Sequence, residues 1–188
     1  MTSIEQLTPG DFDLFLAYLN DHLSDNGRDG TGYFQPLSRD DSRFPADKAD
    51  AFRTGMGVDF GAPGWRRVWV ARDADGRIGG HIDLRAHAER YAGHRCLLGM
   101  GVDRGQRKAG LGGRLIAHAQ AWAQQSARLE WIDLQVLSSN TPAVNLYLRH
   151  GFHKTGEIEG MFHIDGQSFS YTGMSMLMPV YENDWPSM

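Results

Sequence analysis

Apolar positions follow a helical spacing in the first third of the chain and a strand spacing after residue 65. Asp11 to about Leu23 is predicted to be an amphipathic helix, because its apolar residues recur every three or four positions. These are Phe12, Phe15, Leu16, Leu19 and Leu23. A short strand over 3–7 is expected before this helix, and a shorter helix over 46–57 after it. The intervening loop, 24–45, is rich in Gly, Asp and Ser, and a loop of this length is more often functional than idle.

The rest of the chain alternates strands with helices. Residues 66–73 and 77–88 flank the turn Asp73-Ala74-Asp75-Gly76, which predicts a hairpin. The nearly uninterrupted apolar run 94–103 predicts a central strand. The remaining segments are a helix over 110–127, a strand over 131–137, a helix over 140–150 and two strands within 152–178. This order predicts a mixed α/β sheet with hairpin and crossover connections. Because no linker or repeat interrupts the chain, we expect one domain over 1–188.

Composition adds a few constraints. The 188 residues are 41% apolar and 22% charged, as in ordinary soluble globular proteins. The net charge of −4 argues against nucleic acid as a general partner. No signal peptide or 18-residue apolar stretch is visible, so we expect a cytoplasmic protein with no membrane partner. The single cysteine, Cys96, excludes an internal disulfide and is expected to be structural, since it lies in the apolar strand.

The first candidate binding segment is "RGQRKAGLGGRL", residues 104–115, which joins the apolar strand to the next helix. The first amides of a helix have no internal acceptor, and the helix dipole makes that end positive, so such a junction can bind an anion. Glycines allow the main chain to approach a phosphate closely. The four cations expected to add charge for the same anion are Arg104, Arg107, Lys108 and Arg114.

Two nucleotide motifs are excluded at this junction by single positions. Gly105 and Gly110 have the spacing of a nucleoside-triphosphate loop, but Leu111 stands where that loop needs lysine. Leu115 stands where the dinucleotide fingerprint needs its third glycine. What remains is Arg107-x-x-Gly110-x-Gly112. Taken alone, this pattern also fits a glycine-rich turn with solvated cations.

A second segment, "NTPAVNLYLRHGF" from Asn140 to Phe152, decides between these interpretations. Together the two segments resemble the GCN5-related N-acetyltransferase (GNAT) family, whose patterns are Arg/Gln-x-x-Gly-x-Gly/Ala and Asn-x-x-Ala-x-x-Leu-Tyr-x-x-x-Gly-Phe. The resemblance covers about residues 68–178. It implies a GNAT-like acyl-CoA N-acyltransferase fold: a central, mostly antiparallel twisted sheet, splayed between its fourth and fifth strands and flanked by about four helices.

The resemblance implies acetyl-CoA as the acyl donor. Amides from about Gly105 to Gly112 would hold the pyrophosphate. The main chain at Gly101 and Val102 would pair with the pantetheine arm and polarise the thioester carbonyl, with a bulge at Gly99 or Gly101 opening the strand. Asn140 would contact the cofactor, although capping alone explains an Asn there. The residues assigned to the cofactor are Gly101, Val102, Arg107, Lys108, Ala109, Gly110, Leu111, Gly112, Gly113, Asn140, Ala143 and Tyr147.

The resemblance also suggests the proton donor but leaves the acceptor of the amine proton open. Tyr147 is the expected general acid for the departing thiolate, with simple ring packing as the alternative. Many relatives use an acid on the central strand as general base, whereas residues 94–102 contain none. The candidates are Asp83, His81, Asp133 and His163. Each would otherwise be a solvated side chain, and a chain of waters could also suffice. No zinc-ligand spacing occurs, so no metal is expected.

The function implied is direct transfer of an acetyl group, in a ternary complex, to a primary amine of a small molecule. The alternatives are acetylation of a protein N-terminus or lysine, and a non-catalytic acyl-CoA sensor. The 24–45 loop and the last hairpin are expected to choose the acceptor, and their acids would favour a cationic amine. Those acids are Asp25, Asp29, Asp40, Asp41, Glu159 and Asp165. Pairing as a homodimer through the C-terminal strands is a further expectation from the resemblance.

Overall fold

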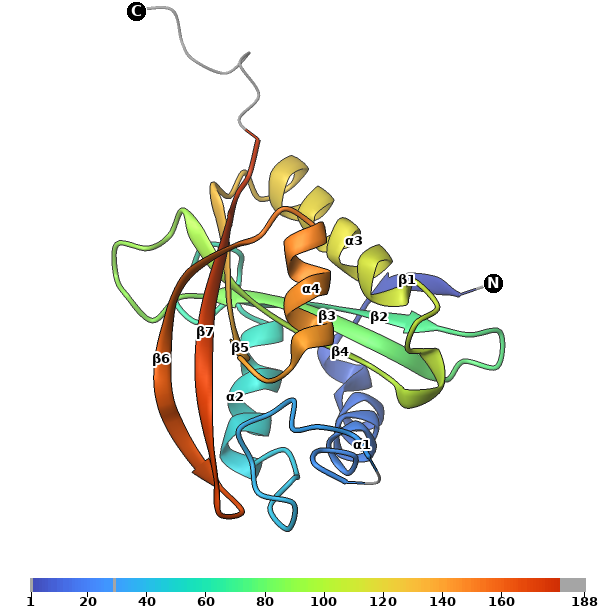
Figure 1. Ribbon diagram of the computed structural model, residues 1–188. Helices are drawn as coiled ribbons and strands as arrows, with labels where there is room; N and C mark the ends of the chain where they lie inside the picture. The colour runs from blue at the N-terminus through green and yellow to red at the C-terminus, as the bar shows by residue number, and fades with distance from the viewer. Residues whose placement is uncertain (1, 29, 180–188) are drawn as a thin grey trace, which may run out of the picture.

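The computed structural model describes residues 2–28 and 30–179, and Figure 1 shows their arrangement. The strands are β1 (Ser3–Gln6), β2 (Arg66–Arg72), β3 (Ile78–Ala86), β4 (Arg95–Val102), β5 (Trp131–Leu137), β6 (His153–Ile164) and β7 (Gln167–Leu177). The helices are α1 (Phe12–Leu23), α2 (Ala46–Met56), α3 (Leu111–Gln125) and α4 (Thr141–Arg149). Each element predicted from the periodicity is present, with ends that differ by a few residues at most. No helix of the described residues is long and apolar enough to cross a membrane.

The sheet has the order β1-β2-β3-β4-β5-β7-β6 and is antiparallel except for the β4–β5 pair. β4 is the middle strand, as its apolar sequence predicts. β4 and β5 pair in parallel only where residues 95–97 face residues 131–133, and then they separate. The predicted mostly antiparallel sheet, splayed between the fourth and fifth strands, is therefore confirmed. The rest of β4, residues 98–102, has main-chain groups without a β5 partner.

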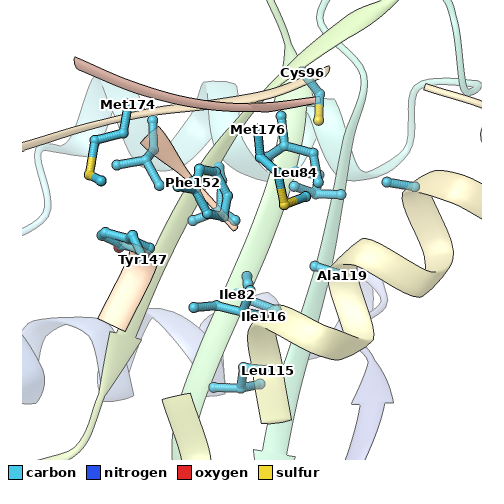
Figure 2. Close-up of a cluster of buried hydrophobic side chains, with 14 of the residues drawn as sticks. Ile82, Leu84, Cys96, Leu115, Ile116, Ala119, Tyr147, Phe152, Met174 and Met176 are labelled. Carbon is cyan, nitrogen blue, oxygen red and sulfur yellow. The ribbon is translucent and has the colours of Figure 1, made fainter. Parts of the chain in front are cut away.

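Two apolar clusters cover opposite faces of the sheet. On β2, Val68 and Val70 pack with the apolar residues of α1 and α2, whereas Trp69 and Ala71 point to the other face. The larger cluster lies on that other face, between the sheet and helices α3 and α4, and Figure 2 shows its centre. Cys96 is fully buried there and burial raises the pKa of its thiol, in agreement with a structural role. The sheet therefore separates a side covered by α3 and α4 from a side covered by α1 and α2.

The glycines of β4 serve a different purpose from the one expected. The β3–β4 register runs without a shift, so the bulge expected at Gly99 or Gly101 is absent. Instead, neither position has room for a side chain. A Cβ at Gly99 would lie 2.5 Å from Asp83 Oδ1, and one at Gly101 would lie 2.7 Å from His22 Nε2. These glycines make room for polar side chains on the α1–α2 side of the sheet, and β4 leaves β5 without a bulge.

The 24–45 loop is ordered around one fully buried amide. Asn26 Oδ1 accepts hydrogen bonds from the amides of Phe34 and Gln35, at 2.8 and 3.0 Å. Its Nδ2 donates to Leu37 O at 3.0 Å and to Ser42 Oγ at 3.1 Å. A buried amide with its groups satisfied fixes the path of a chain that has no regular structure of its own. The described residues of this loop lie beside α1 and α2 (Figure 1).

Candidate active site

The β4–α3 junction leaves a run of amides free. Lys108 and Gly110 have positive φ angles of 64° and 78°, and α3 begins at Leu111. A non-glycine residue in this left-handed region is strained and is often found where a ligand is held. Within the described residues, no hydrogen bond takes the amides of 107–113. The Gly105 amide, by contrast, already donates to Asp103 Oδ1 at 2.8 Å, so it does not belong to the free run.

The four cations of the junction do not all face the same place. Arg104 forms ion pairs with Asp21 and Asp25, at 3.0 and 2.8 Å, near the end of α1. Arg114 donates to the main chain of Thr2 at 2.8 Å. The common role expected for these two arginines is therefore not what the structure shows. Arg107 lies 3.5 Å from Asp25 and also donates to Val102 O, while Lys108 is exposed.

Two glycines of the junction are explained by helix packing. A Cβ at Gly112 would lie 2.9 Å from the Leu146 side chain, and one at Gly113 would lie 2.8 Å from His150 Nε2. Met100 and Val102 of β4 lie within 4 Å of the same Gly112 position. The start of α3, the middle of α4 and the end of β4 therefore meet at one point, which is the end of the gap between β4 and β5.

Tyr147 lies in α4, which covers this gap, and Asn140 is the residue just before that helix. Tyr147 is 7% exposed, packs edge-on against Phe152, and lies in the large cluster of Figure 2. Its hydroxyl makes no hydrogen bond to any described residue, and burial raises the pKa of the phenol. Asn140 caps α4, with Oδ1 accepting from the Ala143 amide at 3.4 Å. The packing and capping roles weighed for these two residues are thus present, and roles toward a ligand stay predictions.

On the α1–α2 side of the sheet, three polar rings surround Gly101. Tyr18 lies with its hydroxyl 3.4 Å from Gly101 O and 3.2 Å from His81 Nδ1. His22 packs against both rings, and its Nδ1 is buried with no hydrogen-bond partner among the described residues. A buried polar atom left unpaired costs roughly 1–3 kcal/mol, so such an atom calls for an explanation.

Both histidines are neutral at physiological pH. Burial lowers the pKa of His81 to about 3, with smaller contributions from His22 and Arg66. Burial also lowers the pKa of His22 to about 4, assisted by the positive charge of Arg107 and opposed by Asp25. Neutral imidazoles accept as well as donate hydrogen bonds. Neither Tyr18 nor His22 is in a motif, and only the helical spacing that puts them on one face of α1 could have suggested them.

Asp83 is held by two arginines. Arg66 and Arg85 each donate from Nη1 to Asp83 Oδ2, at 3.0 and 3.2 Å, and the carboxylate is almost fully buried. Phe52 of α2 lies against the Arg66 guanidinium, 3.8 Å from its carbon to the ring centre. The Asp83 carboxylate therefore holds the guanidinium groups of Arg66 on β2 and Arg85 on β3 side by side.

The other two predicted base candidates lie away from this group. Asp133 accepts from Arg95, His87 and Ser175 at the closed end of the β4–β5 pair, and these hydrogen bonds outweigh burial and lower the pKa of its carboxyl group. His163 is exposed on β6, opposite Ser168. The structure therefore brings His81 and Asp83 together beside Gly99 and Gly101, and leaves Asp133 and His163 elsewhere.

A pocket of about 430 Å³ opens over these residues. Its floor includes His81, Asp83, Arg85 and Gly99, and its walls come from α1, α2 and the 24–45 loop. None of the described acids expected at its mouth lines the pocket: these are Asp25, Asp40, Asp41, Glu159 and Asp165. Asp165 accepts from Tyr33, Asp25 pairs with Arg104, and Asp40 is 98% exposed beside Arg28. Asp29 lies outside the described residues. The expected preference for a cationic amine therefore has no support in the charges that line the pocket.

Comparisons with known proteins point to one family. Residues 64–154 match the family model described as an acetyltransferase (GNAT) domain. The chain is 33% identical over 100 residues to the N-terminal acetyltransferase A complex catalytic subunit NAA10 of Arabidopsis thaliana, a match that covers 53% of this chain and 52% of that protein. The chain thus spans about half the length of this curated relative.

Solved structures extend the similarity over nearly the whole chain. A GNAT-family acetyltransferase from Streptococcus pneumoniae is 25% identical with a TM-score of 0.76, covering 94% of this chain and 99% of that one. A spermidine N-acetyltransferase chimera from Vibrio cholerae and hSSAT is 20% identical with a TM-score of 0.68, covering 94% and 95%. A ribosomal-protein-alanine N-acetyltransferase from Brucella melitensis is 17% identical with a TM-score of 0.73, covering 93% and 99%. The last two share the fold and have different acceptors in their names.

Proposed function

Because the chain belongs to the GNAT family of acetyltransferases, we propose that it moves an acetyl group from acetyl-CoA directly to the primary amine of a small molecule. The observation that carries the donor half is the separation of β4 from β5 after residues 95–97. The free main chain of β4 leads into the free amides of 107–113. An extended arm paired with β4 would thus place its attached pyrophosphate at the start of α3, where amides and the helix dipole favour an anion.

The residues on the two sides of this opening supply different parts of the reaction. On the donor side, Tyr147 would give its proton to the departing sulfur, and its raised pKa keeps the phenol protonated until then. On the acceptor side, the neutral ring of His81 lines the pocket beside Gly101. With a pKa of about 3, His81 is a hydrogen-bond acceptor for a neutral amine rather than a strong base. The proton that the amine loses would then pass to water.

The 24–45 loop supports a small acceptor. It walls the pocket and is joined to the last hairpin, where the Tyr33 hydroxyl and the Arg39 amide both donate to Asp165 Oδ2. A peptide would need an open groove at this place. The similarity to an N-terminal acetyltransferase makes peptide acetylation the second candidate, but the family match over 64–154 lacks the loop and the hairpin.

Binding of the donor can be tested by protein stability. A ligand that binds only the native protein at a concentration of 100 Kd raises the free energy of unfolding by about 2.7 kcal/mol. We expect this increase with acetyl-CoA and a much smaller one with the same concentration of acetyl-pantetheine, which lacks the pyrophosphate. Equal stabilisation by the two compounds would contradict a pyrophosphate site at the junction, and none by either would exclude the donor.

Turnover can be followed by release of the CoA thiol during incubation with amines and with peptides. Cys96 is fully buried, so the protein's own thiol does not interfere with a thiol reagent. Faster turnover of peptides than of every small amine would favour the second candidate. Tight donor binding without turnover of any acceptor would favour the sensor.

A further inference from the structure

The pocket that would take the acceptor has an excess of positive charge. Its lining contains three basic side chains, Lys48, Arg66 and Arg85, against the single acid Asp83, and its histidine is neutral. Lys48 is exposed at the rim on α2 and the two arginines lie deeper, with side chains 18% and 33% exposed. An uncompensated positive charge in a partly dehydrated pocket is costly, and an anion from the ligand would offset that cost.

Arg66 and Arg85 each have N–H donors that no hydrogen bond within the described residues uses. Each uses only Nη1 on Asp83, and no hydrogen bond to a described residue is made by Nε or Nη2 of either guanidinium. Phe52 fixes the plane of the Arg66 guanidinium from one side. Burial lowers the pKa of Arg66, opposed by the negative charge of Asp83 and assisted to a smaller degree by the positive charge of Arg85. A planar oxyanion with two oxygens is the ligand that fits such a pair of forks.

We propose that the acceptor is an amino carboxylate, whose carboxylate binds Arg66 and Arg85 with help from Lys48, and whose amine points to Gly101. This inference rests on the proposed acetyl transfer. His81, beside Gly101, and Asp83, which binds the two arginines, are neighbours on one face of β3, roughly 7 Å apart by the strand repeat. The amine and the carboxylate of the acceptor are therefore expected to be separated by a distance of this order. The remaining walls are largely apolar, with Leu19, Leu23, Leu37, Phe44 and Phe52, and suit a short hydrocarbon between the amine and the carboxylate.

The test compares matched probes for binding and for turnover. The probes are ω-amino carboxylates of three to six carbons, and for each length the amide, the simple alkylamine and the diamine. Binding is measured by thermal stabilisation of the whole protein with the probe alone, and turnover by CoA release. We expect at least one amino carboxylate to bind at least tenfold more tightly than its amide and alkylamine, and the diamines to bind most weakly.

The variants locate the effect within the pocket. Arg85→Gln is expected to weaken amino carboxylate binding tenfold or more, and Lys48→Gln, at an exposed position, three- to tenfold. Arg90→Gln removes the same charge from the exposed β3–β4 turn outside the pocket, and is expected to change nothing. Lys48→Gln keeps the test valid if Arg85→Gln fails to fold.

The outcomes separate this inference from the proposed function. Preference for amides, alkylamines or diamines, or equal weakening by Arg90→Gln, would overturn the inference and leave acetyl transfer intact if CoA is released. Carboxylate-dependent binding without CoA release from any probe would support the anion site while counting against acetyl transfer.

Discussion

The two regions proposed to bind the donor and the acceptor, called here the donor side and the acceptor side, are built in different ways. The donor side, 95–114 with 140–152, consists of two continuous segments, in which main-chain amides, glycines and one tyrosine are the groups proposed to act. The acceptor side takes single side chains from α1, α2, β2 and β3: His22, Lys48, Arg66, His81 and Arg85. A phosphate held by successive amides requires adjacent residues, and adjacent residues form a motif. A pocket assembled from four elements forms none.

Two solved structures with this fold carry different acceptors in their names. The two donor segments fix the gap between β4 and β5 and the start of α3, and these belong to the sheet itself. The proposed acceptor pocket is lined by side chains from separate elements, among them Lys48, Arg66 and Arg85. Experiments can therefore perturb each side separately and ask whether the other side responds.

The largest effect is expected on the donor side, from Tyr147→Phe. Loss of a general acid lowers kcat about 10²–10⁴-fold, while the Kd for acetyl-CoA should change little because the phenyl ring keeps its packing. Single-turnover kinetics with a good acceptor measures the chemical step directly. Tyr91→Phe, in the exposed β3–β4 turn, is the matched control. Full kcat in Tyr147→Phe would mean that this tyrosine only packs.

The second effect concerns the acceptor side and depends on pH. His22 and His81 have folded pKa values of about 4 and 3, below the ordinary 6.5, so the folded state resists their protonation. Their contribution is therefore complete above about pH 6.5 and is lost as pH falls toward 4 and 3. At pH 5 the loss is about 2 kcal/mol for each histidine. Urea denaturation at pH 5, 6 and 7 measures it.

Two substitutions check which histidines cause this loss. His81→Asn can keep a hydrogen bond to Tyr18 and is expected to remove about half of the loss between pH 7 and pH 5. His163→Asn, on exposed β6, is expected to leave the loss unchanged. The ordinary aspartate pKa is near 3.8, so Asp133 contributes little in this window. A flat stability profile in the wild-type protein would contradict the neutral, buried state of both rings.

The smallest effect is expected at the boundary between the two sides, from Gly101→Ala. The new Cβ would lie 2.7 Å from His22 Nε2 and 2.8 Å from His81 Cε1, so both rings have to move. Overpacking of this kind costs about 1–3 kcal/mol, which equilibrium denaturation at pH 7 detects. Gly93→Ala has open space at its Cβ and is the control. An undisturbed stability in Gly101→Ala would show that the two rings are free to shift.

Much of the fold follows from the sequence because its apolar periods are regular. The helical spacing of Phe12, Phe15 and Leu19, and the apolar run of β4, put each element on the correct face or in the centre of the sheet. The family resemblance predicted that β4 separates from β5. It did not predict how the separation arises in this chain. A bulge was expected at two glycines that in fact leave space for Asp83 and His22, and such cross-sheet contacts leave no periodic signal.

At the site, groups that are adjacent in the sequence could be predicted, whereas ion pairs and hydrogen bonds between distant side chains could not. Sequence reasoning identified the glycine and cation junction, but it grouped Arg104 and Arg114 with the anion site, whereas they bind Asp21, Asp25 and Thr2. Acids of the 24–45 loop and of the last hairpin were signs of a cationic acceptor in the sequence, although Asp25 and Asp165 have partners in distant segments. The sequence gives the sign of each charge but neither its position in the fold nor its partner. The net charge of a pocket depends on ion pairs that form only in the folded chain.

Tyr33 and Asp165 stand 132 positions apart, and one hydrogen bond of 2.5 Å joins their side chains. The 24–45 loop and the β6–β7 turn are therefore coupled, and a replacement of one segment affects the other. Replacing the loop alone with that of a relative, in order to change the proposed acceptor, would leave Asp165 without the Tyr33 donor and the new loop without this anchor. A graft of the loop would therefore have to include the β6–β7 turn as well.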